Sequence, residues 1–74
     1  MTGLRPVPAR KPLRALGGFG FHLVSQRGSH VKLRHANGRT VIVPVHPSRD
    51  IKVGLLRRIL DDAGISSDEF LQTL

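Results

Sequence analysis

Histidines and carboxylates are the side chains that most often move protons in enzymes, and this 74-residue sequence distributes them unevenly. Four histidines are present, whereas no Asp or Glu occurs before Asp50. Paired carboxylates are therefore not expected, and no two histidines have the i, i+4 spacing of a helical metal site. Because the chain contains no cysteine, thiol catalysis and cysteine zinc sites are excluded, and we expect no metal or cofactor. The histidines are His22, His30, His35 and His46.

His30 is the histidine with the clearest chemical potential. It follows the turn residues Gly28 and Ser29 and lies two and four positions before Lys32 and Arg34. Imidazole titrates near neutral pH, and RNA carries its own nucleophile, the 2′-hydroxyl group. A histidine that exchanges a proton with that hydroxyl or with the leaving 5′-oxygen, beside cations that stabilise phosphate charge, needs no metal to cleave RNA. Residue types alone still favour an ordinary surface histidine.

The positive charge is concentrated in the first two thirds of the chain. Twelve Lys and Arg against five Asp and Glu give a net charge of +7. Residues 1–49 contain nine basic and no acidic side chains, whereas residues 50–74 contain three basic and five acidic ones. This distribution favours a polyanionic partner, either nucleic acid or an acidic protein surface, over charge that serves solubility alone.

The length allows one small domain, and the sequence predicts that it begins after a basic arm. Residues 1–8 show no periodicity and are expected to be flexible, which leaves 9–74 as the domain. A short helix should end at Gly17–Gly18. Pro12 implies that this helix either starts near Pro12 itself or starts near Pro8 and is kinked. No apolar run reaches the roughly 20 residues that span a bilayer, and nothing resembles a signal peptide, so a cytoplasmic protein without membrane contact is expected.

Hydrophobic periodicity predicts an α+β fold with the element order α-β-β-β-α and a short additional C-terminal helix. The apolar positions alternate in three segments that should form a three-stranded antiparallel sheet. A stripe at helical spacing follows, and a capping box of Ser66 and Glu69 begins the last helix. The expected strands are 20–26, 30–35 and 39–46, and the main helix is 53–63.

The turn between the second and third strands decides which side chains share a face. A two-residue turn at Asn37–Gly38 would place basic side chains among the valines of the third strand, whereas a three-residue turn at 36–38 pairs Leu33 with Val41. We expect the three-residue turn, with Gly38 in the left-handed conformation. Helices should then cover the valine face and leave the other face open. That open face would carry His30, Lys32, Arg34, Thr40, Ile42, Pro44 and His46.

Three segments resemble, in order and spacing, the HicA family of small toxins, the mRNA-cleaving halves of HicA–HicB toxin–antitoxin pairs. They are GFHLVSQRGSH at 20–30, GRTVIVPVH at 38–46 and IKVGLLRRILDDAGI at 51–65, and the resemblance extends over residues 13–70. It implies a double-stranded-RNA-binding-domain-like fold and an RNase activity that needs no metal. The family histidine falls on His30, and the glycine before it falls on Gly28.

The residues and the resemblance lead to the hypothesis of a type II toxin that cleaves mRNA with His30 as general acid or base. His46 is the possible acid partner, and Gly28 and Ser29 form the supporting turn. RNA would bind at Lys32, Arg34, Arg27 and Arg39, and a HicB-like antitoxin would bind at Ile42 and Pro44. The alternatives are a non-catalytic RNA-binding module of the same fold and a degenerate toxin retained only for antitoxin binding. Because the phenylalanines are expected in the core, the open face lacks stacking platforms for bases, which favours the nuclease.

Overall fold

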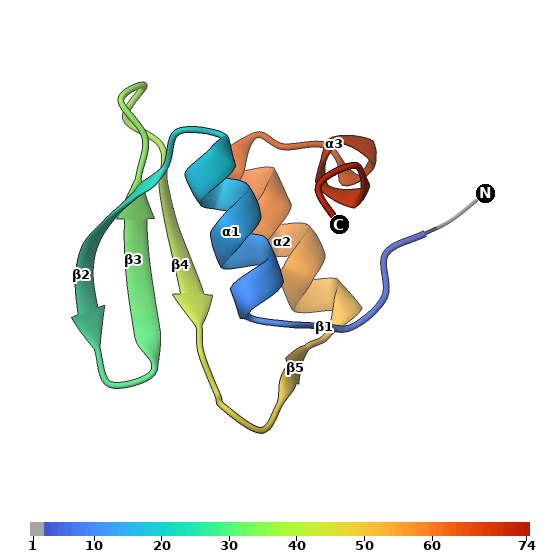
Figure 1. The fold of residues 1–74 in the computed structure, drawn as a ribbon. Coiled ribbons are helices and arrows are strands. Elements are labelled where there is room, and N and C mark those ends of the chain that lie inside the picture. Colours follow the sequence, from blue (N-terminus) through green and yellow to red (C-terminus); the bar gives the residue numbers. More distant parts are fainter. Residues whose placement is uncertain (1–2) are drawn as a thin grey trace.

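Three consecutive strands form an antiparallel sheet in the order β2-β3-β4, with β3 in the centre. This is the arrangement in a computed structural model, which describes residues 3–74 (Figure 1). The strands are β2 (His22–Arg27), β3 (His30–Arg34) and β4 (Thr40–Pro44). All six residues of β2 are exposed, because β2 is the edge strand away from the helices. The strand starts two residues later than expected, after Gly20 with a φ of 96°.

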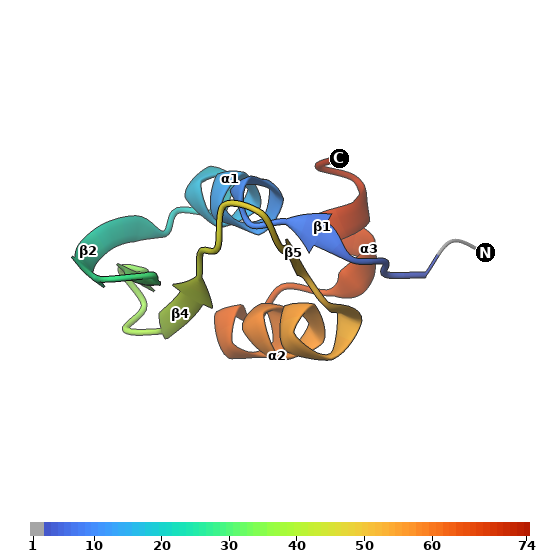
Figure 2. The same cartoon turned by 90° about the horizontal axis from the view of Figure 1, so that it is seen from below.

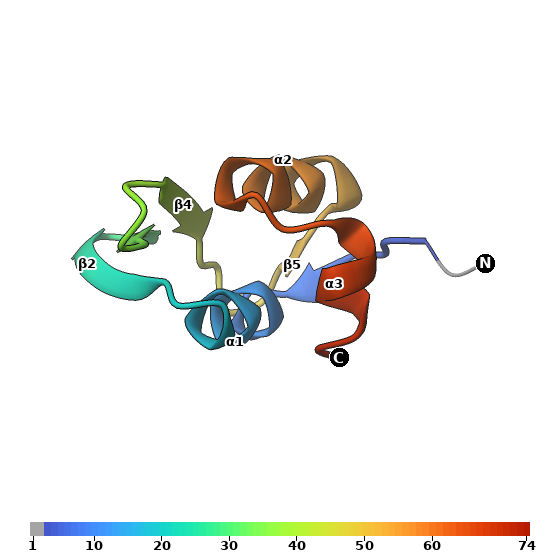
Figure 3. The ribbon, with the colours of Figure 1, turned by 90° about the horizontal axis from the view of Figure 1, so that it is seen from above.

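Two helices pack beside the core face of this sheet, and a third lies near the C-terminus. They are α1 (Arg10–Gly18), α2 (Val53–Ala63) and α3 (Ser67–Leu71). Seen along the sheet from below and from above, α1 and α2 lie on opposite sides of the core, and α2 runs beside β4 (Figures 2 and 3). The expected α-β-β-β-α order and the additional short helix are confirmed. No helix within residues 3–74 is both long and apolar enough to cross a membrane.

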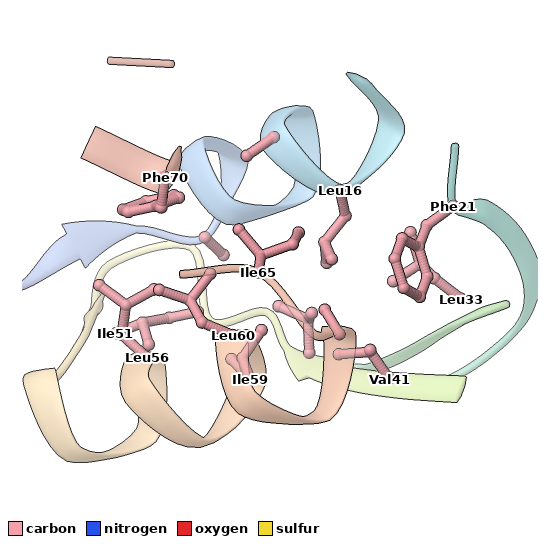
Figure 4. Close-up of a cluster of buried hydrophobic side chains, with 14 of the residues drawn as sticks. Leu16, Phe21, Leu33, Val41, Ile51, Leu56, Ile59, Leu60, Ile65 and Phe70 are labelled. Carbon is pink, nitrogen blue, oxygen red and sulfur yellow. The ribbon is translucent and has the colours of Figure 1, made fainter. Parts of the chain in front are cut away.

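The pairing of β3 with β4 has the predicted register. Leu33 lies opposite Val41 and Val31 opposite Val43, and all four are buried. The turn spans residues 36–38, and Gly38 has a φ of 94° and donates its N–H to the His35 carbonyl at 2.9 Å. The valine face therefore packs into the core, where side chains from α1, α2, β4 and α3 meet (Figure 4). The labelled contributors from these elements include Leu16, Leu60, Val41 and Phe70. The expectation that the phenylalanines serve the core is also confirmed, since Phe21 and Phe70 are buried and Phe19 packs against the cluster.

The expectation of a flexible arm through residue 8 is wrong at its C-terminal end. Val7 and Pro8 form a short strand, β1, that pairs antiparallel with β5 (Asp50–Ile51). Val7 is only 6% exposed and belongs to the core. The expectation failed because a two-residue strand has no periodicity to recognise, and Pro8 is tolerated since an edge position needs no backbone donor. The arm's first two residues lie outside the described part of the chain.

Pro12 neither marks the start of α1 nor kinks it, in contrast to the two expected alternatives. The helix begins at Arg10, after Ala9 as its N-cap, so Pro12 is the third helical residue. Backbone N–H groups in a first turn have no acceptor within the helix, and the missing N–H of Pro12 therefore costs no hydrogen bond. The early start needs no kink, and Pro12 itself is buried.

The C-terminal helices agree with the sequence signals. Helix α2 has the predicted bounds, and its predicted apolar stripe is buried. It ends at Gly64, which has a left-handed φ of 73°. In α3 the capping box is complete: Ser66 Oγ accepts from the Glu69 N–H at 3.0 Å, and Glu69 Oε1 accepts from the Ser66 N–H at 2.9 Å. Gly64 and the capping box therefore define the connection through which α3 follows α2 and packs against it.

Candidate active site

His30 is the first residue of β3, directly after the two-residue turn Gly28–Ser29. Gly28 has a positive φ of 55°, whereas no other residue type in the described chain has one, so Ser29 has a negative φ. This pattern of φ signs is typical of a type II′ hairpin turn, whose first central position favours glycine. The turn is held from both sides: Gln26 Nε2 donates to the Gly28 carbonyl at 3.2 Å, and the Val45 N–H donates to the Ser29 carbonyl at 2.6 Å. The backbone of this turn therefore fixes the position from which the His30 side chain extends.

The three strands bring the predicted site residues into cross-strand rows on one face. The row at His30 joins Arg27 on β2 to Pro44 on β4. The next rows are Ser25, Lys32 and Ile42, followed by His22, Arg34 and Thr40. A register irregularity between Leu23 and Ser25 keeps this alternation in step. Most of the predicted RNA-binding residues thus share a face with His30, and this face is positively charged.

This face is bordered along β4 by helix α2, which the sequence did not indicate. A groove of about 320 Å³ lies between the two elements, and His30 is one of the residues that line it. Its sheet wall comes from His30, Thr40, Ile42 and Pro44, and its helix wall comes from Leu55, Arg58, Ile59 and Asp62. Sequence reasoning placed Arg58 and Asp62 outside the apolar stripe of α2, but that assignment alone does not say which part of the sheet they meet.

The groove combines a titratable side chain, one cation and an apolar surface. His30 and Arg58 are both exposed, and so are the apolar side chains of Ile42 (53%) and Leu55 (39%). Asp62 adds one negative charge at the rim. An imidazole and a guanidinium that line one groove have the two functions that phosphodiester cleavage requires, which are proton transfer and stabilisation of phosphate charge. Among the described residues that line the groove, none has a phenyl, phenol or indole ring for base stacking.

Arg39, expected to bind RNA, follows the β3–β4 turn, and its side chain reaches the C-terminal end of α2. Its Nη1 donates to the Asp62 carbonyl at 3.2 Å. A Cβ atom built on Gly64 would lie 2.9 Å from the Arg39 Cζ atom, so the guanidinium packs closely over the end of the helix. A cation at this end interacts favourably with the helix dipole and its unpaired carbonyls. The contacts of Arg39 are therefore those of a structural link between the β3–β4 turn and α2.

The sequence of this chain matches one protein family over residues 9–65, the family described as HicA toxin of bacterial toxin-antitoxin. That match covers most of the 74 residues. The chain belongs to the HicA toxin family. A comparison with curated proteins found no match. Membership gives this protein the role of a toxin in a toxin–antitoxin system, and it implies a cognate antitoxin.

The other histidines of this HicA toxin are separated from the His30 groove. His46 lies beyond the end of β4 and lines neighbouring hollows instead. His22 is exposed, whereas His35 is only partly exposed. His35 is half-buried, its ring centroid lies 5.1 Å from that of Phe21, and its Nδ1 accepts from the Asn37 N–H at 3.0 Å. Within residues 3–74, no three His, Asp or Glu side chains lie close enough together to hold a metal ion.

Proposed function

We propose that this HicA toxin is an endoribonuclease that cleaves mRNA in the cytoplasm without a metal, with His30 as the general acid or base. The observation that supports the proposal most is that His30 opens into the same groove as Arg58. Arg27, Lys32 and Arg34 extend the positive charge across the face that carries His30.

In the proposed reaction the 2′-oxygen of the RNA attacks the adjacent phosphorus. The 2′-hydroxyl loses its proton, a 2′,3′-cyclic phosphate forms, and the bond to the 5′-oxygen breaks as that oxygen gains a proton. His30 carries one of these protons. Solvent carries the other, because no second histidine lines the groove among the described residues and the groove is open to water. Arg58 stabilises the negative charge that gathers on the phosphate oxygens.

The direct test is cleavage of single-stranded RNA by the purified toxin and its His30→Ala variant. The variant is expected to lose cleavage and to keep its circular dichroism spectrum, because His30 is exposed and outside the core. His22→Ala is the matched control, since His22 is another exposed histidine on the same face. EDTA should leave the wild-type rate unchanged. Equal cleavage by wild type and His30→Ala removes His30 from the mechanism. RNA binding without cleavage by the wild type favours the non-catalytic RNA-binding module, and neither binding nor cleavage favours the degenerate toxin.

We propose further that a HicB-like antitoxin inhibits the toxin by covering this groove. Ile42 and Leu55 expose large apolar surfaces on its two walls, and the half-buried Pro44 lines the same wall as Ile42. A partner that buries these side chains gains apolar contact and blocks access to His30 in the same step.

A further inference from the structure

Beyond the His30 groove, the surface of the toxin continues into two hollows with basic walls. The nearer hollow, of about 240 Å³, shares Pro44 and Leu55 with the His30 groove. It is also lined by His46, Arg49 and Lys52. The farther hollow, of about 480 Å³, shares His46, Arg49 and Asp50 with the nearer one. The shared residues make the three depressions neighbours on the surface, and we call the two beyond Pro44, taken together, the basic hollow.

Cations outnumber carboxylates in the basic hollow. Arg49 and Lys52 line its nearer part, and Arg10 lines its farther part. All three are exposed, so their charges face solvent. Asp50 is the opposing acidic residue, and the first turn of α1, which starts at Arg10, contains no acidic side chain. The hollow is therefore positively charged, and its cations are different residues from those on the face that carries His30.

Distant parts of the chain build the basic hollow. Arg10 begins α1, Arg49 lies in the β4–β5 loop, and Lys52 precedes α2. The β1–β5 pairing, with Pro8 opposite Asp50, brings the first of these segments to the others. Figure 2 shows the β4–β5 loop beside the start of α1. No local motif contains these cations, which is why the sequence did not reveal them as a group.

We propose that the basic hollow is a second phosphate subsite, which binds the backbone of the RNA strand next to the phosphodiester at His30. The inference rests on the proposed RNase function and adds where the flanking strand lies. A single strand is held without sequence preference by a positive groove that follows its backbone. The shared border favours RNA over an acidic protein as the occupant, because a strand that leaves the His30 groove past Pro44 and Leu55 reaches the neighbouring hollow.

The test measures binding of a single-stranded RNA 12-mer to the His30→Ala protein over a range of salt concentrations. The Arg49→Gln/Lys52→Gln pair is expected to lower the slope of log affinity against log salt by about 1.4, since each single-strand contact contributes about 0.7. At about 0.1 M salt this equals a loss of affinity of roughly 25-fold. Arg14→Gln/Arg57→Gln is the matched control, because it removes the same charge at exposed positions outside the hollow and the groove, and its slope should not change.

A second variant, Arg10→Gln, tests the hollow from its other wall and should lower the slope by about 0.7. Circular dichroism of each variant confirms that it folds. A slope and affinity equal to those of the control pair overturn the subsite, even if wild-type toxin cleaves RNA. Cleavage failure with an altered slope overturns the RNase function and keeps the subsite. If the Arg49 and Lys52 changes weaken antitoxin binding and spare RNA, the hollow belongs to an acidic partner and the proposal is wrong.

Discussion

His30 lies opposite Pro44 in the β3–β4 ladder, and both residues line the groove beside α2. Proline has no N–H to donate, so the next hydrogen bond at this end of the ladder is made by Val45, whose N–H donates to the Ser29 carbonyl at 2.6 Å. The position of His30 is thus set by main-chain contacts on both sides of its strand. Changes to side chains around His30 should therefore alter chemistry and binding more than folding.

Arg58→Gln is expected to slow RNA cleavage by about tenfold to a hundredfold, because it removes the cation that shares the groove with His30. The effect should fall below that of a buried oxyanion donor, since water screens an exposed guanidinium. Arg57→Gln, at the neighbouring exposed position on α2 but outside the groove, should keep nearly the full rate. Single-turnover cleavage measures both. Equal rates for the two variants would remove Arg58 from the site.

Ile42→Asp is expected to weaken antitoxin binding at least tenfold, which corresponds to about 1.4 kcal/mol. The change removes apolar contact and buries a carboxylate in the interface. The toxin itself should stay folded, because Ile42 is 53% exposed and faces away from the core. Leu23→Asp, at a 60% exposed leucine on β2, is the control that should bind normally. Calorimetric titration with the antitoxin gives the affinities, and a folded Ile42→Asp toxin with unchanged affinity would place the antitoxin elsewhere.

Gly64→Ala is expected to lower the free energy of unfolding by about 1–2 kcal/mol, because alanine is disfavoured at a φ of 73°. Its Cβ would also lie 2.9 Å from Arg39 Cζ and push the guanidinium off the helix end. Gly17→Ala is the opposite case: Gly17 is helical, its φ is not positive, and nothing lies within 4 Å of the added Cβ. That variant should be more stable by up to about 1 kcal/mol. Urea denaturation measures both, and a neutral Gly64→Ala would contradict the strain.

Acid is expected to remove the stabilising effect of Glu69. A hydrogen bond from the Ser66 backbone N–H holds the pKa of the Glu69 carboxylate below its usual range, and a hydrogen bond with the Ser66 side chain adds to the effect. A pKa that is lower in the folded state stabilises the fold at pH values above the unfolded pKa, and this contribution disappears as the pH falls through the folded pKa. Glu69→Gln keeps the capping geometry without the charge, so its stability deficit at pH 7 should vanish as the pH falls through the folded-state pKa of Glu69. A deficit that persists in acid would contradict this cause.

Most of the framework around His30 could be predicted because it depends on local alternation. The valines of β4 determine the register with β3, since a shift of one residue would bury Lys32 and Arg34. The spacing of apolar residues and Gly64 likewise determine the bounds of α2. What could not be predicted is how these elements meet. Periodicity says which side of α2 is apolar, but not that α2 lies along β4, where Arg58 lines the same groove as His30. The same limit applies to Arg39, whose acceptor lies 23 positions away.

We expect the β1–β5 pair to form late in folding. Each hairpin of the β2–β4 sheet joins residues close in sequence, whereas β1 with β5 joins Val7 to Ile51. Distant pairings form more slowly because the intervening loop must first be ordered, and a two-residue strand adds few contacts in return. This closure should therefore be the first to open, with faster amide exchange at Val7 than at Val31. Each opening would separate Arg10 from Arg49 and leave the groove at His30 intact. The surface available to the RNA strand would then alternate between the groove alone and the groove together with the basic hollow.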